Sequence, residues 1–213
     1  MKNITYILIL VFLTTISNAQ SPILPKYDNS YYGDVNNAYY KDINSIHNQY
    51  VGTWLYTNGN TSLKIILKKK TMIYHIGHTN TYYTDDLVGE YQYIENGVDL
   101  VNTLSAINNE YSDSWDYNLC STSLKRNNAY PKCNECSPEE KRLNMQFNEP
   151  SRRHITGFSN DFLLRRFFEN GTEKLKIWFV CRDNGIYRTK DDFNLTNITR
   201  FSLPYGEYTL IKQ

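Results

Sequence analysis

The chain has 213 residues, with 23 Lys and Arg against 22 Asp and Glu. This balance gives the protein no overall field to attract nucleic acid or an anionic membrane, and nucleic acid is not an expected partner. The length suits one domain with a sizeable core, and the 19 Tyr favour β-strands.

Residues 1–19 have the three-part layout of a secretory signal peptide. Lys2 provides the positive start, residues 7–13 form an apolar stretch, and Ser17-Asn-Ala19 supplies small residues before the cleavage point. The apolar stretch is too short for a permanent anchor, and no later segment is apolar enough to cross a membrane. We therefore expect an exported protein, periplasmic or secreted, whose mature chain begins at about Gln20.

A polar leader over residues 20–45 is expected to precede a single domain over residues 46–213. Strand signals open that domain at residues 50–56 and continue through residues 62–70, where Leu63, Ile65 and Leu67 share one face. Residues 87–94 and 98–104 form the clearest hairpin, with Tyr91 and Tyr93 predicted to face inward. The polar neighbours on residues 87–94, Glu90 and Gln92, are expected to point outward.

Residues 105–141 break this pattern and are predicted to form an excursion between strands. Strand signals resume at residues 142–147, 155–158, 162–169, 174–181 and 208–212. Asn-Gly pairs at residues 58–59, 96–97 and 170–171 mark tight hairpin turns. The sequence thus predicts an all-β, antiparallel up-and-down barrel of about 8–10 strands, because closing a meander removes its exposed edges.

The four cysteines are Cys120, Cys133, Cys136 and Cys181. An even number in an exported chain favours structural disulfides, and the sequence leaves all three pairings open. A bridge from Cys120 to Cys133 or Cys136 would close the excursion locally. The alternative is a redox or metal pair at Cys133 and Cys136, but Pro and Ser neighbours place this pair in a loop.

Gly52-Thr-Trp54 on the first strand resembles the Gly-x-Trp opening of lipocalins. The resemblance implies that Trp54 is a structural plug at the closed end of the barrel. It also implies an Arg packed over this Trp, for which Arg200 is the candidate. The Thr-Asp-Tyr signature of that family is not matched, because Thr84-Asp85 is followed by Asp86.

The whole chain is similar to a group of secreted lipocalin-like proteins of Flavobacteria and other Bacteroidota. The likeness rests on the signal ending Ser17-Asn-Ala-Gln20, the opening Tyr50-Val-Gly-Thr-Trp54, the Asn-Gly hairpins and the ending Pro204-Tyr-Gly-Glu-Tyr-Thr-Leu-Ile-Lys212. It implies the barrel and the compartment, and it carries no activity.

Candidate chemistry is sparse. His75 and His78 are three apart and point to opposite faces of a strand, which opposes a metal site. The pairs Asp85-Asp86 and Glu139-Glu140 lie next to predicted turns and are interpreted as solvated. With no nucleophile motif, we expect no enzyme, no metal and no cofactor.

Two functions remain open. The first is a binding module whose barrel interior holds a small hydrophobic ligand. The alternative is a structural or surface-interaction protein with a filled barrel and an unspecified protein partner. The residues expected to line the interior are Tyr91, Tyr93, Leu100, Ile177 and Phe179.

Overall fold

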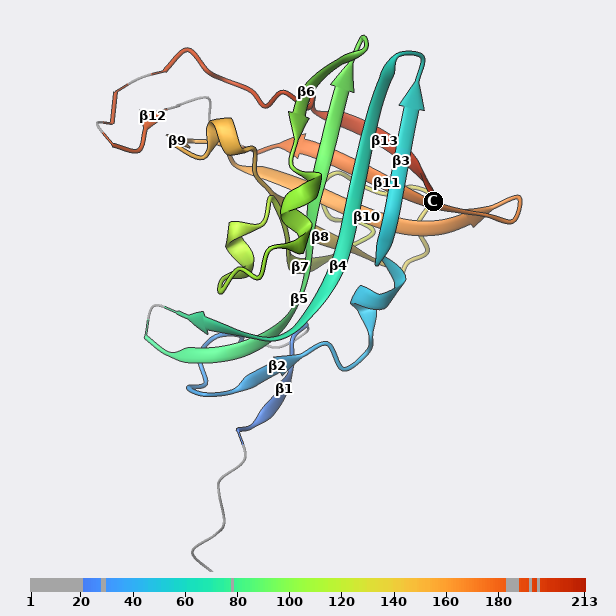
Figure 1. Cartoon of the computed structure of the whole chain (residues 1–213). Helices are drawn as coiled ribbons and strands as arrows, with labels where there is room; N and C mark the ends of the chain where they lie inside the picture. Colours follow the sequence, from blue (N-terminus) through green and yellow to red (C-terminus); the bar gives the residue numbers. More distant parts are fainter. Residues whose placement is uncertain (1–20, 28–29, 78, 183–187, 192, 195) are drawn as a thin grey trace, which may run out of the picture.

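The computed structural model describes residues 21–27, 30–77, 79–182, 188–191, 193–194 and 196–213 (Figure 1). The predicted signal residues therefore lie outside the described part of the chain. Among the described residues, no helix is long and apolar enough to cross a membrane.

The main body is a closed antiparallel barrel in which each strand pairs with the next around the ring. Its strands are β3 (Gly52–Asn58), β4 (Thr61–Ile76), β5 (Thr81–Glu95), β7 (Leu119–Arg126), β8 (Lys141–Phe147), β10 (Asn160–Glu169), β11 (Thr172–Cys181) and β13 (Gly206–Lys212). The ring closes where β13 pairs with β3, through Lys212 opposite Trp54. This closure confirms the predicted all-β barrel and leaves no long barrel edge for another chain to pair with.

Short elements complete the fold. The strands outside the barrel ring are β1 (Ile23–Pro25), β2 (Tyr39–Lys41), β6 (Val98–Asn102), β9 (Ile155–Thr156) and β12 (Arg188–Thr189). The 3-10 helices are η1 (Ile46–Gln49), η2 (Leu104–Asn108), η3 (Ser114–Asp116) and η4 (Pro150–Arg152).

The tight turns follow the Asn-Gly chemistry of the sequence. Asn96-Gly97 and Asn170-Gly171 have positive φ at both positions, as a two-residue hairpin turn requires. The turn between β3 and β4 is displaced by one residue, because Asn58 still pairs with Thr61 and leaves residues 59–60 as the loop.

The predicted excursion at residues 105–141 contains a barrel strand that the sequence pattern did not reveal. β7 pairs with β5 on one side and with β8 on the other. A bulge between Ser121 and Ser123 interrupts its alternation, which hides the strand period from a sequence reading.

Two segments cover the outer wall of the barrel. Residues 104–117, with η2 and η3, pack Ile107 and Tyr117 against Val88. Glu90, predicted to point outward, is buried, and it accepts a 2.6 Å hydrogen bond from Asn118 Nδ2. Burial raises the pKa of Glu90 despite this bond.

The second cover is the loop after β7. Its Cys133–Cys136 disulfide packs on Leu163 and Trp178 of the barrel wall. The prediction of structural disulfides is correct for this pair, although it is neither of the two bridges to Cys120 that would close the excursion. It is wrong for Cys120, which is a buried thiol, and for Cys181, which is an exposed one.

The hairpin of β4 and β5 extends below the barrel, where β2 and then β1 add to β5 in parallel (Figure 1). The expected polar leader thus contributes two strands. Its chain then passes through η1 into β3, beneath the barrel core.

Candidate functional site

The barrel interior holds four of the five residues predicted to bind a ligand. Tyr91, Ile177 and Phe179 are 0% exposed and Tyr93 is 2% exposed. Because the first three have no accessible surface, no space the size of a water molecule adjoins them. Leu100 is 44% exposed, since β6 pairs only with β5 and lies outside the barrel ring.

Aromatic rings fill the end of the interior that lies near β6. The Phe147 ring is centred 4.8 Å from Tyr91, 4.5 Å from Phe179 and 5.1 Å from Phe201. Rings at these separations form the offset and edge contacts of a packed core. The Tyr91 hydroxyl is buried with no hydrogen-bond partner among the described residues, and burial raises its pKa.

A pocket of about 730 Å³ is lined by residues of β7 and β8, and it borders Phe147 and Phe201 of this aromatic cluster. Its walls come from the end of β8, the start of β10 and the connection between them, which carries η4 and β9. Phe158 and Phe201 contribute apolar surface, and Trp115 stands at the side. The sequence pattern gave no sign of this pocket, because irregular segments complete its walls.

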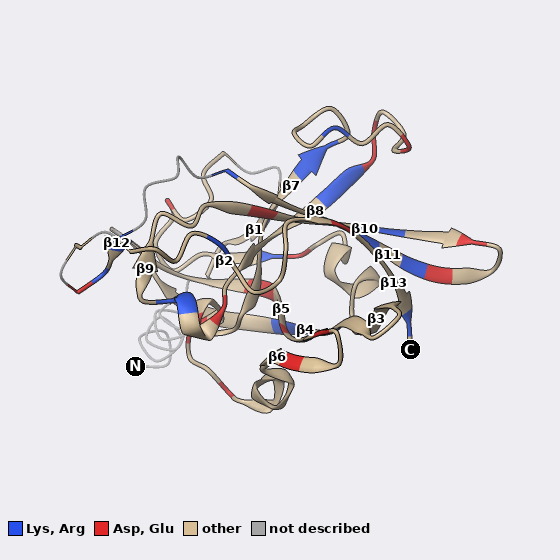
Figure 2. Cartoon of the chain, turned by 90° about the horizontal axis from the view of Figure 1, so that it is seen from above, with Lys and Arg blue, Asp and Glu red and all other residues tan. Residues whose placement is uncertain are grey.

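The charged side chains of the pocket lining are mostly basic. It includes the cationic side chains Lys125, Arg152, Arg153, Arg182 and Lys190, and Glu149 is its acidic side chain. Seen from above, basic segments lie on η4 and on β12 at this side of the molecule (Figure 2). A lining of this sign attracts anions.

Glu149 acts as a brace inside the pocket wall. It is 1% exposed, and it accepts hydrogen bonds from Ser202 N at 2.7 Å and from Ser151 Oγ at 2.7 Å. These bonds join the connection after β8 to the segment before β13. The carboxylate therefore holds the pocket wall together, and its oxygens are already hydrogen-bonded to Ser151 and Ser202.

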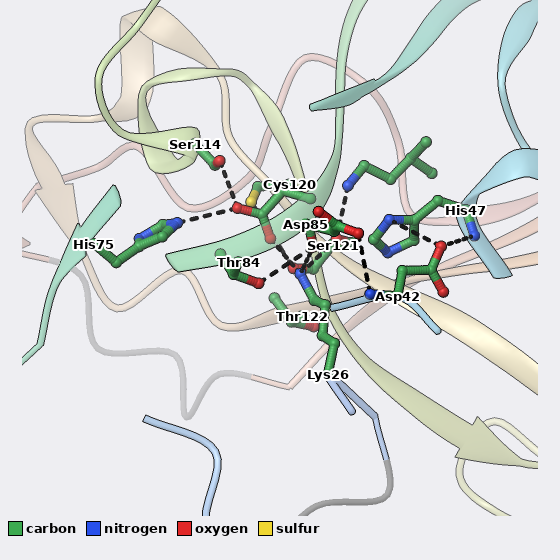
Figure 3. A network of polar contacts seen from close by, with 12 residues as sticks. Lys26, Asp42, His47, His75, Thr84, Asp85, Ser114, Cys120, Ser121 and Thr122 are labelled. Carbon is green, nitrogen blue, oxygen red and sulfur yellow. Dashed lines mark hydrogen bonds and ion pairs between the residues drawn. The ribbon is translucent and has the colours of Figure 1, made fainter. Parts of the chain in front are cut away.

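A second group of polar residues, drawn in Figure 3, joins the leader to β4, β5, η3 and β7. Lys26 from the segment after β1 forms a buried ion pair with Asp86 of β5. Lys26 Nζ also donates to Asp85 O at 2.7 Å and to Ser121 Oγ at 3.3 Å. Asp86 accepts two more hydrogen bonds, from His75 Nε2 at 3.0 Å and from Ser114 Oγ at 2.6 Å.

The ion pair holds both partners in their charged forms. Burial opposes the charge of Asp86, but Lys26 and the hydrogen bonds from His75 and Ser114 outweigh it and lower the pKa of Asp86. Burial likewise opposes the charge of Lys26, and Asp86 reverses this, so that the pKa of Lys26 is raised. The prediction that Asp85 and Asp86 are solvated is wrong, because the leader covers them at 1% and 2% exposure.

Asp42 and His47 continue this network into η1. Asp42 accepts from the backbone N–H groups of Ile46 at 2.8 Å and His47 at 3.0 Å, which anchors the 3-10 helix. The His47 ring is fully buried, with Nε2 2.6 Å from Tyr27 Oη. Burial, reinforced by the nearby Lys26 charge, lowers the pKa of His47 to about 4.

This network ties the leader to the barrel, and the side chains at its centre are buried. Lys26 and Ser121 are within hydrogen-bond reach, yet they are 4% exposed each. Burial also raises the pKa of Cys120, which keeps that thiol protonated. His75 contacts Asp86, and His78, the other histidine of the pair considered in the sequence, lies outside the described residues. No group of three His, Cys, Asp or Glu in the described chain is placed to hold a metal.

A family model described as a family of unknown function, DUF6705, matches residues 1–213. The chain belongs to this family. The comparisons with curated proteins and with solved structures found no match. Function must therefore be argued from the barrel, its basic pocket and its buried network.

Proposed function

We propose that the protein is an exported, non-enzymatic binding protein that holds a small ligand in the pocket beside β8 and β10. The observation that carries the proposal is the contrast between the two spaces of the barrel. The interior is filled by side chains such as Tyr91 and Phe179, whereas the pocket offers about 730 Å³. This volume lies within the range of sites for small organic molecules.

Export is part of the proposal and is supported by the signal layout of residues 1–19. A lipocalin-like relationship, as in the secreted proteins of Bacteroidota, is supported by Gly52-Thr-Trp54 on β3. The Trp54 side chain is 0% exposed, in agreement with a plug. The cation over its ring is Lys212, and the candidate suggested by the resemblance, Arg200, is exposed instead.

A ligand in the barrel interior, as predicted from the sequence, would require the aromatic side chains of the core to move apart. The pocket needs no such change. A matched pair of variants separates the two locations. Ser123→Trp places an indole in the pocket, whereas Ser62→Trp places one on the outer face of β4, at a half-buried position outside the pocket lining.

The test is a thermal-shift screen with lipids, hydrophobic dyes and polar metabolites. A ligand at 100 times its Kd stabilises the folded state by about 2.7 kcal/mol through mass action. We expect the shift to persist in Ser62→Trp and to disappear in Ser123→Trp. A shift that survives Ser123→Trp but is lost in Tyr91→Phe would place the ligand in the interior and contradict the proposal.

The second candidate is protein contact through the projecting part of β4. Met72, Tyr74 and Ile76 are 56%, 45% and 81% exposed, and they alternate along one strand. Exposed apolar side chains in such a group are typical of interaction surfaces. If this surface mediates self-association, Ile76→Asp will shift the sedimentation coefficient towards that of a monomer.

A further inference from the structure

We propose that the pocket beside β8 and β10 takes a small organic anion, recognised through carboxylate, phosphate or sulfate oxygens. The inference rests on the proposed function, because it names the ligand class of the same pocket. It is argued from how the charged groups of the lining are engaged.

The negative charge of the lining is already neutralised by the protein. Glu149 Oε1 accepts from Ser202 Oγ at 2.8 Å, and Arg152 Nε lies 3.7 Å from the same oxygen. With the Ser151 and Ser202 N–H bonds described above, the carboxylate has its acceptor positions filled. It therefore offers little repulsion to an entering anion.

The positive charges are less completely matched. Arg182 pairs with Asp161 at 3.0 Å. Arg153 donates to carbonyl and amide oxygens, including Asp116 O at 2.9 Å and Tyr117 O at 3.0 Å, and its side chain forms no ion pair with a described carboxylate. The guanidinium group of Arg153 is thus held in place by contacts with uncharged oxygens.

Three further cationic groups have spare capacity. Arg152 Nε is buried and has no hydrogen-bond partner among the described residues. Arg152 Nε keeps only its 3.7 Å ion-pair contact with Glu149, whereas the ammonium groups of Lys125 and Lys190 form no ion pair with any described carboxylate. A buried donor without an acceptor costs free energy, so an anionic oxygen that reached it would be stabilised.

The pocket is too large for a single inorganic ion. A volume of about 730 Å³ accommodates a whole organic molecule, and Phe158 gives its carbon skeleton an apolar contact. The polar side chains Gln146 and Asn148 supply hydrogen-bonding groups for a hydroxylated body. The ligand class is therefore an organic anion that also carries polar groups.

Titration calorimetry on the mature protein at low salt tests this class. The probes are glucuronate, glucose 6-phosphate and citrate, with glucose as the neutral match. We expect at least one anion to bind at least ten-fold more tightly than glucose, and its affinity to fall as salt is raised. The glucuronate and glucose 6-phosphate arms separate carboxylate from phosphate recognition.

The variants assign the effect to the pocket. Lys125→Gln with Lys190→Gln should weaken anion binding about ten-fold, and Lys→Arg at both positions should retain it. Lys132→Gln removes one charge from the disulfide loop, outside the pocket lining, and should leave binding unchanged. A loss with Lys132→Gln equal to that of the double variant would indicate a general field and contradict the proposal.

The outcomes distinguish this inference from the proposed function. If glucose binds as tightly as its anionic analogues and Ser123→Trp abolishes that binding, the pocket is a binding site and the anion class is wrong. If none of the four probes binds, and no compound in the thermal-shift screen is lost with Ser123→Trp, both the anion class and the binding function are wrong.

Discussion

The ammonium group of Lys212 lies 5.3 Å from the centre of the Trp54 ring. The two residues are opposite one another where β13 meets β3, so the contact lies at the seam that closes the barrel. The indole N–H donates to Tyr50 O at 2.8 Å, which ties the chain before β3 to the same side chain. Trp54 thus joins the first and last barrel strands and the entry to the fold.

Trp54→Ala is expected to cost about 3–5 kcal/mol of unfolding free energy, because it leaves a cavity at this seam. Lys212→Met keeps the aliphatic cover and removes only the charge, so it should cost about 0.5–1 kcal/mol. Urea denaturation measures both. A loss below about 0.5 kcal/mol for Trp54→Ala would show that the seam does not depend on this residue.

The ion pair of Lys26 and Asp86 is expected to hold the leader on the barrel. Lys26→Met removes the cation and leaves the Asp86 charge buried, which should cost about 3–5 kcal/mol. Lys26→Met combined with Asp86→Asn removes both charges and should recover part of that loss. If the double variant were no more stable than Lys26→Met, the cost would come from lost packing.

His47 is expected to make the protein sensitive to mild acid. Its pKa is about 4 in the folded chain and near 6.5 when the chain unfolds, so the unfolded chain binds a proton that the folded chain does not between these values. Stability therefore falls as the pH falls from 6.5 to 4, by about 2–3 kcal/mol. The free energy of unfolding, measured by denaturation at several pH values in this window, should change less with pH in His47→Gln. An unchanged pH dependence in this variant would show that another group causes the effect.

The cysteines should differ in reactivity. Without reductant, the native protein should be alkylated at Cys181, and Cys120 should react only after unfolding. Mass spectrometry of the unfolded chain should then find two alkylated thiols and the Cys133–Cys136 bridge. Replacing both bridged cysteines with Ala should cost about 2 kcal/mol, since the loop they close is short. Alkylation of Cys133 in the oxidised protein would contradict this pairing.

The sequence determined the barrel through short-range patterns. Alternating side chains fixed which face of β4, β5 and β11 is buried, and the Asn-Gly pairs at residues 96–97 and 170–171 placed two hairpin turns. Gly52-Thr-Trp54 marked the first barrel strand. These features are local because a strand repeats every two residues and a tight turn needs positive φ at defined positions.

Contacts between distant segments were decided only by the tertiary structure. Asp86 looks like a turn residue until Lys26, 60 positions earlier, is placed beside it. β7 is hidden by its bulge, and Leu100 leaves the barrel because β6 pairs on one side alone. The pocket depends on Glu149 meeting Ser202, 53 positions later, in segments without any period. Burial and charge pairing of this kind depend on which distant segments meet in space. The local preferences of each residue for strand or turn do not determine that.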